Sequence, residues 1–395
     1  MRRDAVTWAA YAYCGSWGWL LFGWGPAIAQ LRDETGVSRG VSALHSIALS
    51  TGSLVAGTLG VLLVRRFGRR TAMVGGALAM AAGIAALLLS TLLPATLAAA
   101  LVIGVGGAVG LNAMSPVLAA HHPDTPSSAI SEANAVAAGL GVVSPLAIGA
   151  TVWAGWGWRP AVGVGALVAL VAGVLLVRAP AAAAWGGRRR RREASPGGPL
   201  GATFWTTLAM LGCTFAVEFA IGFWAVDLLR TDKGLAVGAA SAAVAAFGAG
   251  MALSRWGTPA LARRWNDRRL LGAALATALA GWALLWASPL AWPAVGGLAL
   301  LGLGAGLHFP LGISLLIAAA PGRPDTATAF ASAMAGVAGG AAPFLLGTLA
   351  DQVGPRTAFV AVPGALVAAA ALLLVSRRAS VPFRPRPLGR RPAPA

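Results

Sequence analysis

The sequence has 395 residues, of which 57% are hydrophobic and 11% are charged, with a formal net charge of +18. This composition is too apolar for a soluble domain of this length, and segments of roughly 20 apolar residues, long enough to span a bilayer, recur along the chain. Lipid admits helix bundles and closed barrels, and these segments are longer than barrel strands, so an all-α membrane protein is predicted. The basic residues lie between the apolar segments, which argues against nucleic-acid binding.

Twelve transmembrane helices are expected, six in each half of the chain. The first six cover about residues 6–30, 41–64, 71–92, 95–119, 129–152 and 160–177. The next six cover about residues 202–228, 236–256, 269–288, 293–318, 326–349 and 357–376. The first segment is longer than a signal-peptide core, so it is expected to remain as a helix.

The chain repeats at a spacing of 198 residues. The stretch LVRRFGRR at residues 63–70 returns as LARRWNDR at residues 261–268. Other residues that return at this spacing are Gly36, Gly40, Gly52, Pro145 and Gly149, as Gly234, Gly238, Gly250, Pro343 and Gly347. The repeat predicts two homologous six-helix halves, residues 1–177 and 201–378, a plan found in transporters.

Two further segments are predicted to lie outside the helices. Residues 178–200 form a Pro/Gly-rich linker that contains five consecutive arginines. Residues 379–395 are rich in Pro and Arg and are expected to be a disordered tail.

The positive charge is unevenly distributed between the two ends of the predicted bundle. With both termini on one side, 23 of the 30 basic residues fall on that side, and Arg255 lies inside a helix. Six fall on the other side: Arg32, Arg39, Arg159, Arg230, Lys233 and Arg356. Because basic loops remain in the cytoplasm, both termini and the linker are predicted to be cytoplasmic, in a multi-pass protein of the cytoplasmic (inner) membrane.

The repeated basic loop resembles the loop motif G-x-L-a-D-R-x-G-R-[RK] of the major facilitator superfamily. Five residues of the first copy fit the motif: Leu63, Arg66, Gly68, Arg69 and Arg70. Arg65 stands where the motif has its acid, as Arg263 does in the second copy. The resemblance covers essentially the whole chain and implies twelve transmembrane helices in two pseudo-symmetric halves.

Two narrower patterns suggest subfamilies. Residues 15–19, GSWGW, are similar to the end of the monocarboxylate-transporter signature, although Cys14 replaces its acid. The segment from Gly139 to Gly149 loosely resembles the Gly-Pro motif of drug/proton antiporters. Packing between membrane helices is the alternative interpretation of both patterns: Trp and Gly packing for the first, and close packing of small residues for the second.

Glu218 is the one acid, of twelve, that is expected in the middle of a helix. A charge at the membrane centre costs at least about 2.5–3.5 kcal/mol on insertion scales, so its presence calls for an explanation. Thr214 and Gly222 share its helical face, as expected beside a cavity. A carboxyl group in such a place can load and release protons, which predicts proton coupling. A protonated or paired structural acid is the alternative.

Three other polar residues within helices are candidate site residues. Arg255 could bind a substrate carboxylate through its planar guanidinium, or could extend to the cytoplasmic surface. His308 and Asn112, each after a Gly-Leu pair, are expected to be pseudo-equivalent, with His308 as a second proton-coupling candidate. Interhelical hydrogen bonding is the alternative for both.

Further substrate-binding candidates lie in the first helix and beside Glu218. They are Tyr13, Ser16, Trp17, Trp24 and Thr214. Interfacial tryptophans are common in membrane proteins, so the aromatic members also have a structural interpretation. His45 and Asp227 lie near outer helix ends and are expected to be solvated rim residues.

A cytoplasmic gate is predicted from the loop acids that the repeated motif lacks. Glu132 and Asp325 stand near the starts of two helices, where the helix dipole favours acids. With the cytoplasmic face closed, Arg65 or Arg66 should approach Asp325. Arg263, Arg264 or Arg268 should approach Glu132. Four unrelated surface charges are the alternative.

Together these patterns predict a proton-coupled secondary transporter, and no enzyme. No phosphate-binding loop, metal-spaced cluster or nucleophile elbow occurs, so neither cofactor nor metal is expected. The expected partners are a small organic solute, protons and membrane lipids, with the chain acting as a monomer. A small organic anion is one candidate substrate. Proton-driven efflux of drugs or metabolites is the alternative, and a non-transporting membrane sensor or receptor is the alternative from another class.

Overall fold

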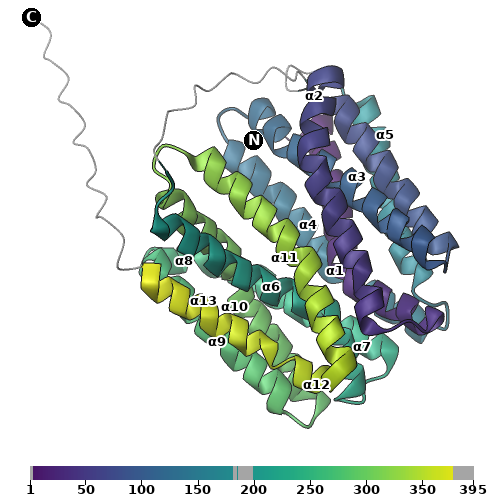
Figure 1. The fold of residues 1–395 in the computed structure, drawn as a ribbon. Coiled ribbons are helices and arrows are strands. Elements are labelled where there is room, and N and C mark those ends of the chain that lie inside the picture. The colour runs from purple at the N-terminus through teal and green to yellow at the C-terminus, as the bar shows by residue number, and fades with distance from the viewer. Residues whose placement is uncertain (1–2, 181–184, 186–198, 377–395) are drawn as a thin grey trace, which may run out of the picture.

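The computed structural model of the protein describes residues 3–180, 185 and 199–376. Throughout this part of the chain the regular structure is helical, as predicted. Helices α1–α5 form one bundle and α6–α13 form a second beside it (Figure 1). Most of the linker and the whole predicted tail lie outside the described residues.

The helices follow the predicted segments closely. In the first half they are α1 (Ala5–Thr35), α2 (Arg39–Leu89), α3 (Leu93–His121), α4 (Pro126–Trp153) and α5 (Arg159–Arg178). In the second half they are α6 (Ala202–Thr231), α7 (Val237–Ala243), α8 (Ala245–Ala262), α9 (Asp267–Ala287), α10 (Ala291–Ala318), α11 (Pro324–Val353), α12 (Pro355–Ala358) and α13 (Ala361–Val375).

These helices make up the twelve predicted transmembrane segments, because one long helix contains two of them and two others are interrupted. Within α2 the chain turns at Gly68, whose φ of 83° is readily adopted by glycine. The predicted loop of the first motif is therefore reduced to a sharp turn at Gly68, which separates two helical stretches, residues 39–67 and 69–89. Conversely, α7 and α8 together form one span, and so do α12 and α13.

Hydropathy alone identifies ten of these segments among the described residues. Helix α1, rich in glycine and tryptophan, is not among them. Helix α1 buries 20 of its 31 residues against neighbouring helices. A helix enclosed by protein has little lipid contact and needs less hydropathy.

The start of α1 is fixed by the short polar side chain of Asp4. Asp4 caps α1 by accepting the backbone N–H and the hydroxyl of Thr7. Its other carboxylate oxygen lies 2.6 Å from Nε2 of His121. Burial alone would raise the pKa of Asp4, but these hydrogen bonds outweigh it and hold that pKa below its ordinary value.

Glycines set the helix spacing within each half, and they do so at equivalent positions. A Cβ added to Gly52 would lie 2.2 Å from the carbonyl oxygen of Leu101. At the repeat spacing, a Cβ on Gly250 would lie 2.1 Å from the carbonyl oxygen of Ala299. The repeat read from the sequence therefore corresponds to the same close backbone contact in both halves.

Candidate functional site between the two halves

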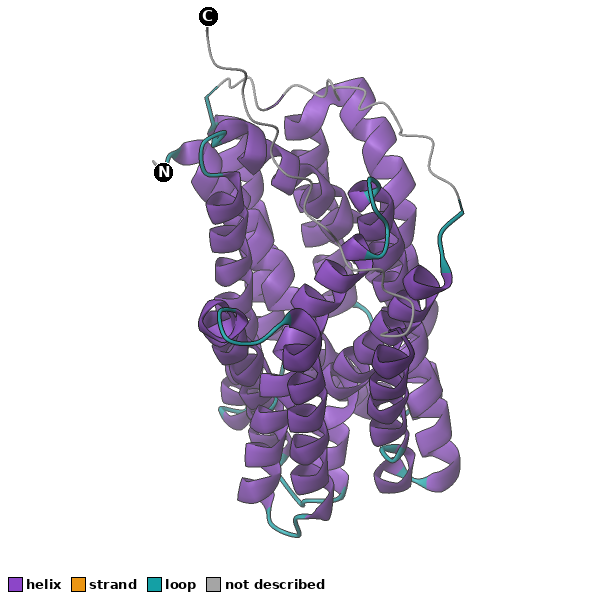
Figure 2. Cartoon of the chain, turned by 90° about the vertical axis from the view of Figure 1, so that its left-hand side faces the viewer, coloured by secondary structure: helices purple, strands orange, loops and turns teal. Residues whose placement is uncertain are grey.

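The two ends of the bundle differ in how the halves meet. We call the end where α1 begins and α13 finishes the terminal end, and the other the opposite end (Figure 2). Helix α2 packs against α11, α4 against α7 and α8, and α1 against α6. These pairs connect one half to the other, so the positions of their contacts along the helices show where the halves touch.

Small residues bring the halves together from the middle of the bundle to the opposite end. A Cβ on Gly25 of α1 would lie 2.2 Å from the carbonyl oxygen of Gly222 of α6. A Cβ on Gly149 of α4 would lie 2.6 Å from the carbonyl oxygen of Gly238 of α7. The pseudo-equivalent contact joins Gly347 of α11 to the backbone of Arg39 at the start of α2.

Ion pairs reinforce this contact. Asp227 of α6 is 2% exposed and lies between two arginines of the first half. Nη2 of Arg32 is 2.6 Å from one carboxylate oxygen, and Nε of Arg39 donates to the other at 2.7 Å. Arg230 of the second half pairs in return with Asp33 of the first.

A second acid from the second half caps a helix of the first. The carboxylate of Asp351, in the last turn of α11, accepts the backbone N–H groups of Arg39 and Gly40 at 3.0 and 2.8 Å. These N–H groups have no partner within α2, because they belong to its first turn. The start of α2 is thus satisfied by the other half of the molecule.

The expectation that Asp227 and His45 are solvated rim residues is wrong. Asp227 is buried in the ion pairs between the halves, and His45 is 2% exposed. Nε2 of His45 lies 2.8 Å from the hydroxyl of Thr96, inside the first half. Both lie near helix ends, as predicted, but the closed contact between the halves excludes solvent from Asp227.

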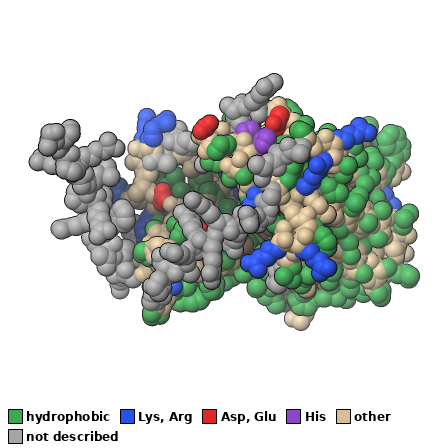
Figure 3. All heavy atoms as spheres, turned by 90° about the horizontal axis from the view of Figure 1, so that it is seen from above, with side chains coloured by type: hydrophobic (Ala, Val, Ile, Leu, Met, Phe, Trp, Pro, Cys, Tyr) green, Lys and Arg blue, Asp and Glu red, His purple; other side chains and the backbone are tan. Residues whose placement is uncertain are grey.

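At the terminal end, the described residues make no ion pair between the halves. Glu132 is bound within its own half, by Arg3 at 2.8 Å and by the hydroxyl of Tyr11 at 2.8 Å. Asp325, Arg65 and Arg66 are exposed. The molecular surface is hollowed between the halves on this face (Figure 3). The gate contacts therefore stay a prediction for a conformation in which this end is closed.

The last arginine of each repeated loop binds the end of a helix in its own half. Arg70 donates from Nε to the carbonyl oxygen of Leu176 at 2.7 Å and also to that of Val177, at the end of α5. Arg268 donates to the carbonyl oxygens of Leu373 and Ser376 at 3.2 and 3.1 Å, at the end of α13. A cation at these carbonyls also complements the helix dipole.

Glu218 lies at the border of the contact between the halves. Its helical face also carries Gly222, one turn nearer the opposite end, where α6 touches α1. Glu218 is half-buried, and Arg255 of α8 acts on it electrostatically. Nε of Arg255 donates to the carbonyl oxygen of Gly306 at 3.2 Å. An acid and a basic group of one half thus lie near the place where the halves separate.

Aromatic side chains neighbour this acid along α6 and on α10. The ring centroids of Phe215 and Phe219 on α6 are 6.4 Å apart, and Phe215 lies 5.8 Å from Phe309 of α10. From the first half, Phe22 of α1 approaches α8 at Gly248. The neighbourhood of Glu218 therefore offers both apolar contact and charge.

His308 and Asn112 do not join this group. His308 is 1% exposed and lies buried on α10 inside the second half. Neither of its ring nitrogens makes a well-formed hydrogen bond within the described part of the chain. Asn112 is exposed on α3. At the repeat spacing His308 corresponds to Gly110, so the expected equivalence with Asn112 is displaced by two residues.

The remaining substrate candidates mostly pack inside their own half. The Tyr13 hydroxyl donates to the carbonyl oxygen of Gly106, and those of Ser16 and Thr214 donate to carbonyl oxygens of their own helices. Trp17 covers Gly107. Each residue stays a predicted binding group, but none of these three hydroxyls is exposed in this conformation.

Trp24 lies against a small internal pocket between α1, α4 and α5. Its indole Nε1 and the hydroxyl of Ser144 are buried without a partner among the described residues. The pocket, of about 10 Å³, offers space on the order of one water molecule. This places Trp24 inside the first half rather than in the space between the halves.

No group of His, Cys, Asp and Glu side chains in the described residues could hold a metal ion.

The ion pairs of the opposite end were not predicted from the sequence. A signal was present, since most of the basic residues predicted there lie within a few positions of an acid. In the structure each of the six pairs with an acid: Arg32, Arg39, Arg159, Arg230, Lys233 and Arg356.

Comparisons with known proteins agree with this architecture. The family model described as Major Facilitator Superfamily matches residues 12–323 and 207–395. No curated protein matches the sequence.

Solved structures of the same fold are numerous. The nucleoside transporter NupG superposes with a TM-score of 0.75 at 10% identity, covering 95% of this chain and 98% of its own. A bacterial homologue of the human lysosomal transporter Spinster, inward-facing and occupied, gives 0.73 at 14% identity, with 95% and 96% covered. The human organic anion transporter MFSD10 gives 0.61 at 16% identity, with 93% and 98% covered.

Proposed function

The chain belongs to the major facilitator superfamily and is a membrane transporter of a small molecule, and on this premise we propose that it is a proton-coupled secondary transporter that works by alternating access. The observation that carries the proposal is the asymmetry between the two ends. Ion pairs and glycine contacts join the halves at the opposite end, whereas at the terminal end the described residues provide no such pair.

Orientation follows from the charges. Five acids, Asp33, Glu34, Asp227, Asp232 and Asp351, pair with the six basic residues of the opposite end. The terminal end carries the large excess of arginine, as expected for the cytoplasmic side. With that orientation, the conformation described here faces the cytoplasm, and the opposite end is the closed outer gate.

Glu218 is the proposed proton site, and Arg255 is the proposed substrate-binding group. While Glu218 is ionised, its negative charge partly offsets the positive charge of Arg255. Protonation removes that charge and leaves the guanidinium to a carboxylate on the substrate, which it can bind through two parallel hydrogen bonds. Proton and anion would then bind together and move in the same direction.

Proton-driven efflux is the second candidate, and the aromatic surroundings of Glu218 favour it. Phe215, Phe219 and Phe309 would contact a lipophilic solute, and ionised Glu218 would attract a cationic one. In this scheme substrate and proton compete for Glu218 and move in opposite directions. The two schemes therefore predict opposite effects of substrate binding on the proton occupancy of Glu218.

The test begins with a thermal-shift screen of organic anions and lipophilic cations on the purified protein, because a ligand raises its stability by mass action. Flux of each hit is then measured in proteoliposomes with an imposed proton gradient. Glu218→Gln should abolish the proton-driven component and leave binding measurable. Arg255→Lys should weaken binding of an anion, because an ammonium group lacks the bidentate geometry.

Three results would count against the proposal. If the flux of a confirmed ligand is the same with and without the proton gradient, transport is not coupled to protons. Anion affinity unchanged in Arg255→Ala would remove the substrate-binding role of Arg255. Specific binding without any flux would favour a membrane sensor or receptor.

A further inference from the structure

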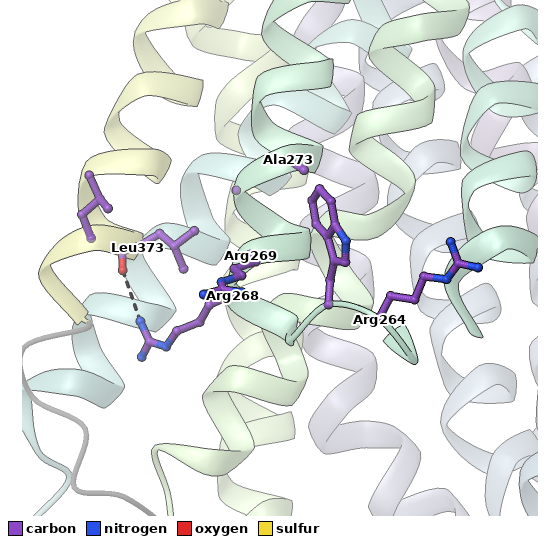
Figure 4. Close-up of a pocket in the computed structure, with 8 residues that line it drawn as sticks. Arg264, Arg268, Arg269, Ala273 and Leu373 are labelled. Carbon is purple, nitrogen blue, oxygen red and sulfur yellow. Dashed lines mark hydrogen bonds between the residues drawn. The ribbon is translucent and has the colours of Figure 1, made fainter. Parts of the chain in front are cut away.

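A pocket of about 600 Å³ opens at the terminal end of the second half, away from the contact between the halves. It lies between the start of α9 and the end of α13 (Figure 4). Its lining combines the arginines Arg264, Arg268 and Arg269 with the indole of Trp265 and an apolar wall that includes Leu374.

The basic side of the pocket is held in place by the helix ends. Arg268 binds the last carbonyl groups of α13, so its guanidinium is positioned between α9 and α13. Arg264 and Arg269 are exposed, and within the described residues their guanidinium groups take part in no ion pair. Arg268 and Arg269 therefore bring two positive charges together at the pocket, while the guanidinium of Arg264 points away from them (Figure 4), and no Asp or Glu is among the lining residues.

The apolar side reaches toward the lipid. Leu374 is 58% exposed in the last turn of α13, and Trp265 is 48% exposed at the start of α9. Partly exposed tryptophan at a helix end is typical of the membrane–water interface. A Cβ on Gly272 would meet no atom within 4 Å, so there is room between the two helices. The pocket thus spans the boundary between headgroups and hydrocarbon.

We propose that this pocket binds the phosphate headgroup of an anionic phospholipid from the leaflet at the terminal end. The phosphodiester would lie against Arg268 and Arg269, and the acyl chains would extend along Leu374 and the lipid-facing side of α13. Basic pockets between transmembrane helices are suited to such headgroups. The proposal rests on the placement of the helices in a membrane and goes beyond the proposed transport.

The tail and the linker of the same chain are less suited to this pocket than an anionic lipid, because both are basic. The 19 residues after Ser376 contain six arginines and no Asp or Glu. The linker contains a single acid, Glu193, beside five arginines. Both segments would add positive charge to a site that already holds three arginines.

The first half supplies a natural control, because its equivalent loop lacks two of these features. At the repeat spacing Arg264, Trp265 and Arg268 correspond to Arg66, Phe67 and Arg70. Arg269, however, corresponds to Thr71, and Gly272 to Val74. At the positions equivalent to the pocket lining, the first half thus has one arginine fewer and a larger side chain where the pocket needs space, although Arg69 stands there in place of Asp267.

The experiment is native mass spectrometry of the full-length protein in detergent, titrated with phosphatidylglycerol, cardiolipin or phosphatidylcholine. We expect the anionic lipids to form a saturable adduct and phosphatidylcholine to form much less. Arg269→Ala should lower the apparent affinity about fivefold, the effect of one arginine near an anionic surface. Gly272→Val, which fills the pocket, should lower it in the same way, whereas Thr71→Ala should leave it unchanged.

Three outcomes would overturn the proposal. Equal binding of phosphatidylcholine would remove the role of charge. Wild-type affinity in both Arg269→Ala and Gly272→Val would place the lipid elsewhere. Loss of the adduct on addition of millimolar inorganic phosphate alone would assign the site to a free phosphate instead of a lipid.

Discussion

At the residue scale, the repeated arginines illustrate how one motif serves two purposes. The sequence assigns Arg268, but not its equivalent Arg70, to the predicted gate. In this conformation both bind the carbonyl end of a neighbouring helix within their own half. The helix ends otherwise leave carbonyl groups without partners. The motif therefore stabilises each half as a unit, whatever it contributes to the gate.

Arg70→Gln should lower the stability of the first half. The lost bonds to Leu176 and Val177 are charge-assisted, and their contribution should lie at the low end of about 1.5–3 kcal/mol because the guanidinium is partly exposed. Thermal unfolding of the purified protein measures it. Arg66→Gln is the matched control, since Arg66 is exposed and contacts Phe67. Equal unfolding temperatures of both variants would mean that the bonds from Arg70 to the end of α5 do not stabilise the first half.

Sequence reasoning reached these residues unevenly. Glu218 and Arg255 could be selected because charges inside apolar segments are costly and few. Asp227 could not, because its burial depends on Arg32 and Arg39, which reach it from the other half. A side chain near a helix end looks solvated until its partner helix is known. The same reason explains why the hydroxyl of Tyr13, a candidate for the cavity, instead packs within the first half.

At the element scale, hydrophobic segment lengths predicted the helices well, and local geometry set the differences. The first loop is reduced to a sharp turn at Gly68, the residue of α2 with non-helical backbone angles, because glycine readily adopts a positive φ. The span at residues 236–256 is interrupted between α7 and α8. Neither detail changes the run of apolar residues from which a transmembrane helix is predicted, so neither could be predicted from the sequence.

Contacts between elements of the two halves depend on small residues, and this leads to a prediction. Gly149→Val should prevent α4 from approaching α7, because a Cβ there would lie 2.6 Å from the carbonyl oxygen of Gly238. The opposite end should then open more often. Labelling of Ser241→Cys, a near-isosteric change at a buried residue of α7, by a membrane-impermeant thiol reagent measures this opening.

Gly139→Val is the matched control for that experiment. Gly139 lies on the same helix, but a Cβ at Gly139 would meet no atom within 4 Å. Its labelling rate should equal that of the parent protein. An equal rate in Gly149→Val as well would mean that the glycine contact does not hold the opposite end closed.

At the scale of the whole molecule, the predicted gate at the terminal end belongs to a conformation not described here. When the opposite end opens, Arg65 or Arg66 should approach Asp325, and Arg263, Arg264 or Arg268 should approach Glu132. Glu132 would have to exchange its present partner Arg3 for one of these. Exposed pairs of this kind contribute only about 0–1 kcal/mol each, which suits a contact that forms and breaks in every cycle.

Charge reversal tests the gate. Asp325→Arg should repel the first loop and raise the population with the terminal end open. The combined variant Asp325→Arg with Arg65→Asp and Arg66→Asp should restore the parent distribution, as seen in the labelling of a cysteine at the terminal end. If the combined variant is folded but does not restore the parent labelling, these groups are unrelated surface charges.

The two ends of the bundle are expected to open and close reciprocally, and the repeat supplies matched positions for measuring this. Leu92 and Leu290 are equivalent exposed residues at the opposite end, and Pro123 and Pro321 are equivalent exposed residues at the terminal end. Spin labels are placed on one pair at a time, with Cys14 and Cys213 replaced by alanine. Electron–electron double resonance then gives the distance distribution for each pair.

Asp227→Asn provides the perturbation, because it removes the charge that binds Arg32 and Arg39 across the opposite end. Breaking a buried ion pair costs about 3–5 kcal/mol, enough to shift a two-state equilibrium strongly. If the ends move reciprocally, the distance between labels at 92 and 290 should lengthen and that between labels at 123 and 321 should shorten, with equal changes in population. A longer 92–290 distance with the 123–321 distance unchanged would contradict reciprocal motion.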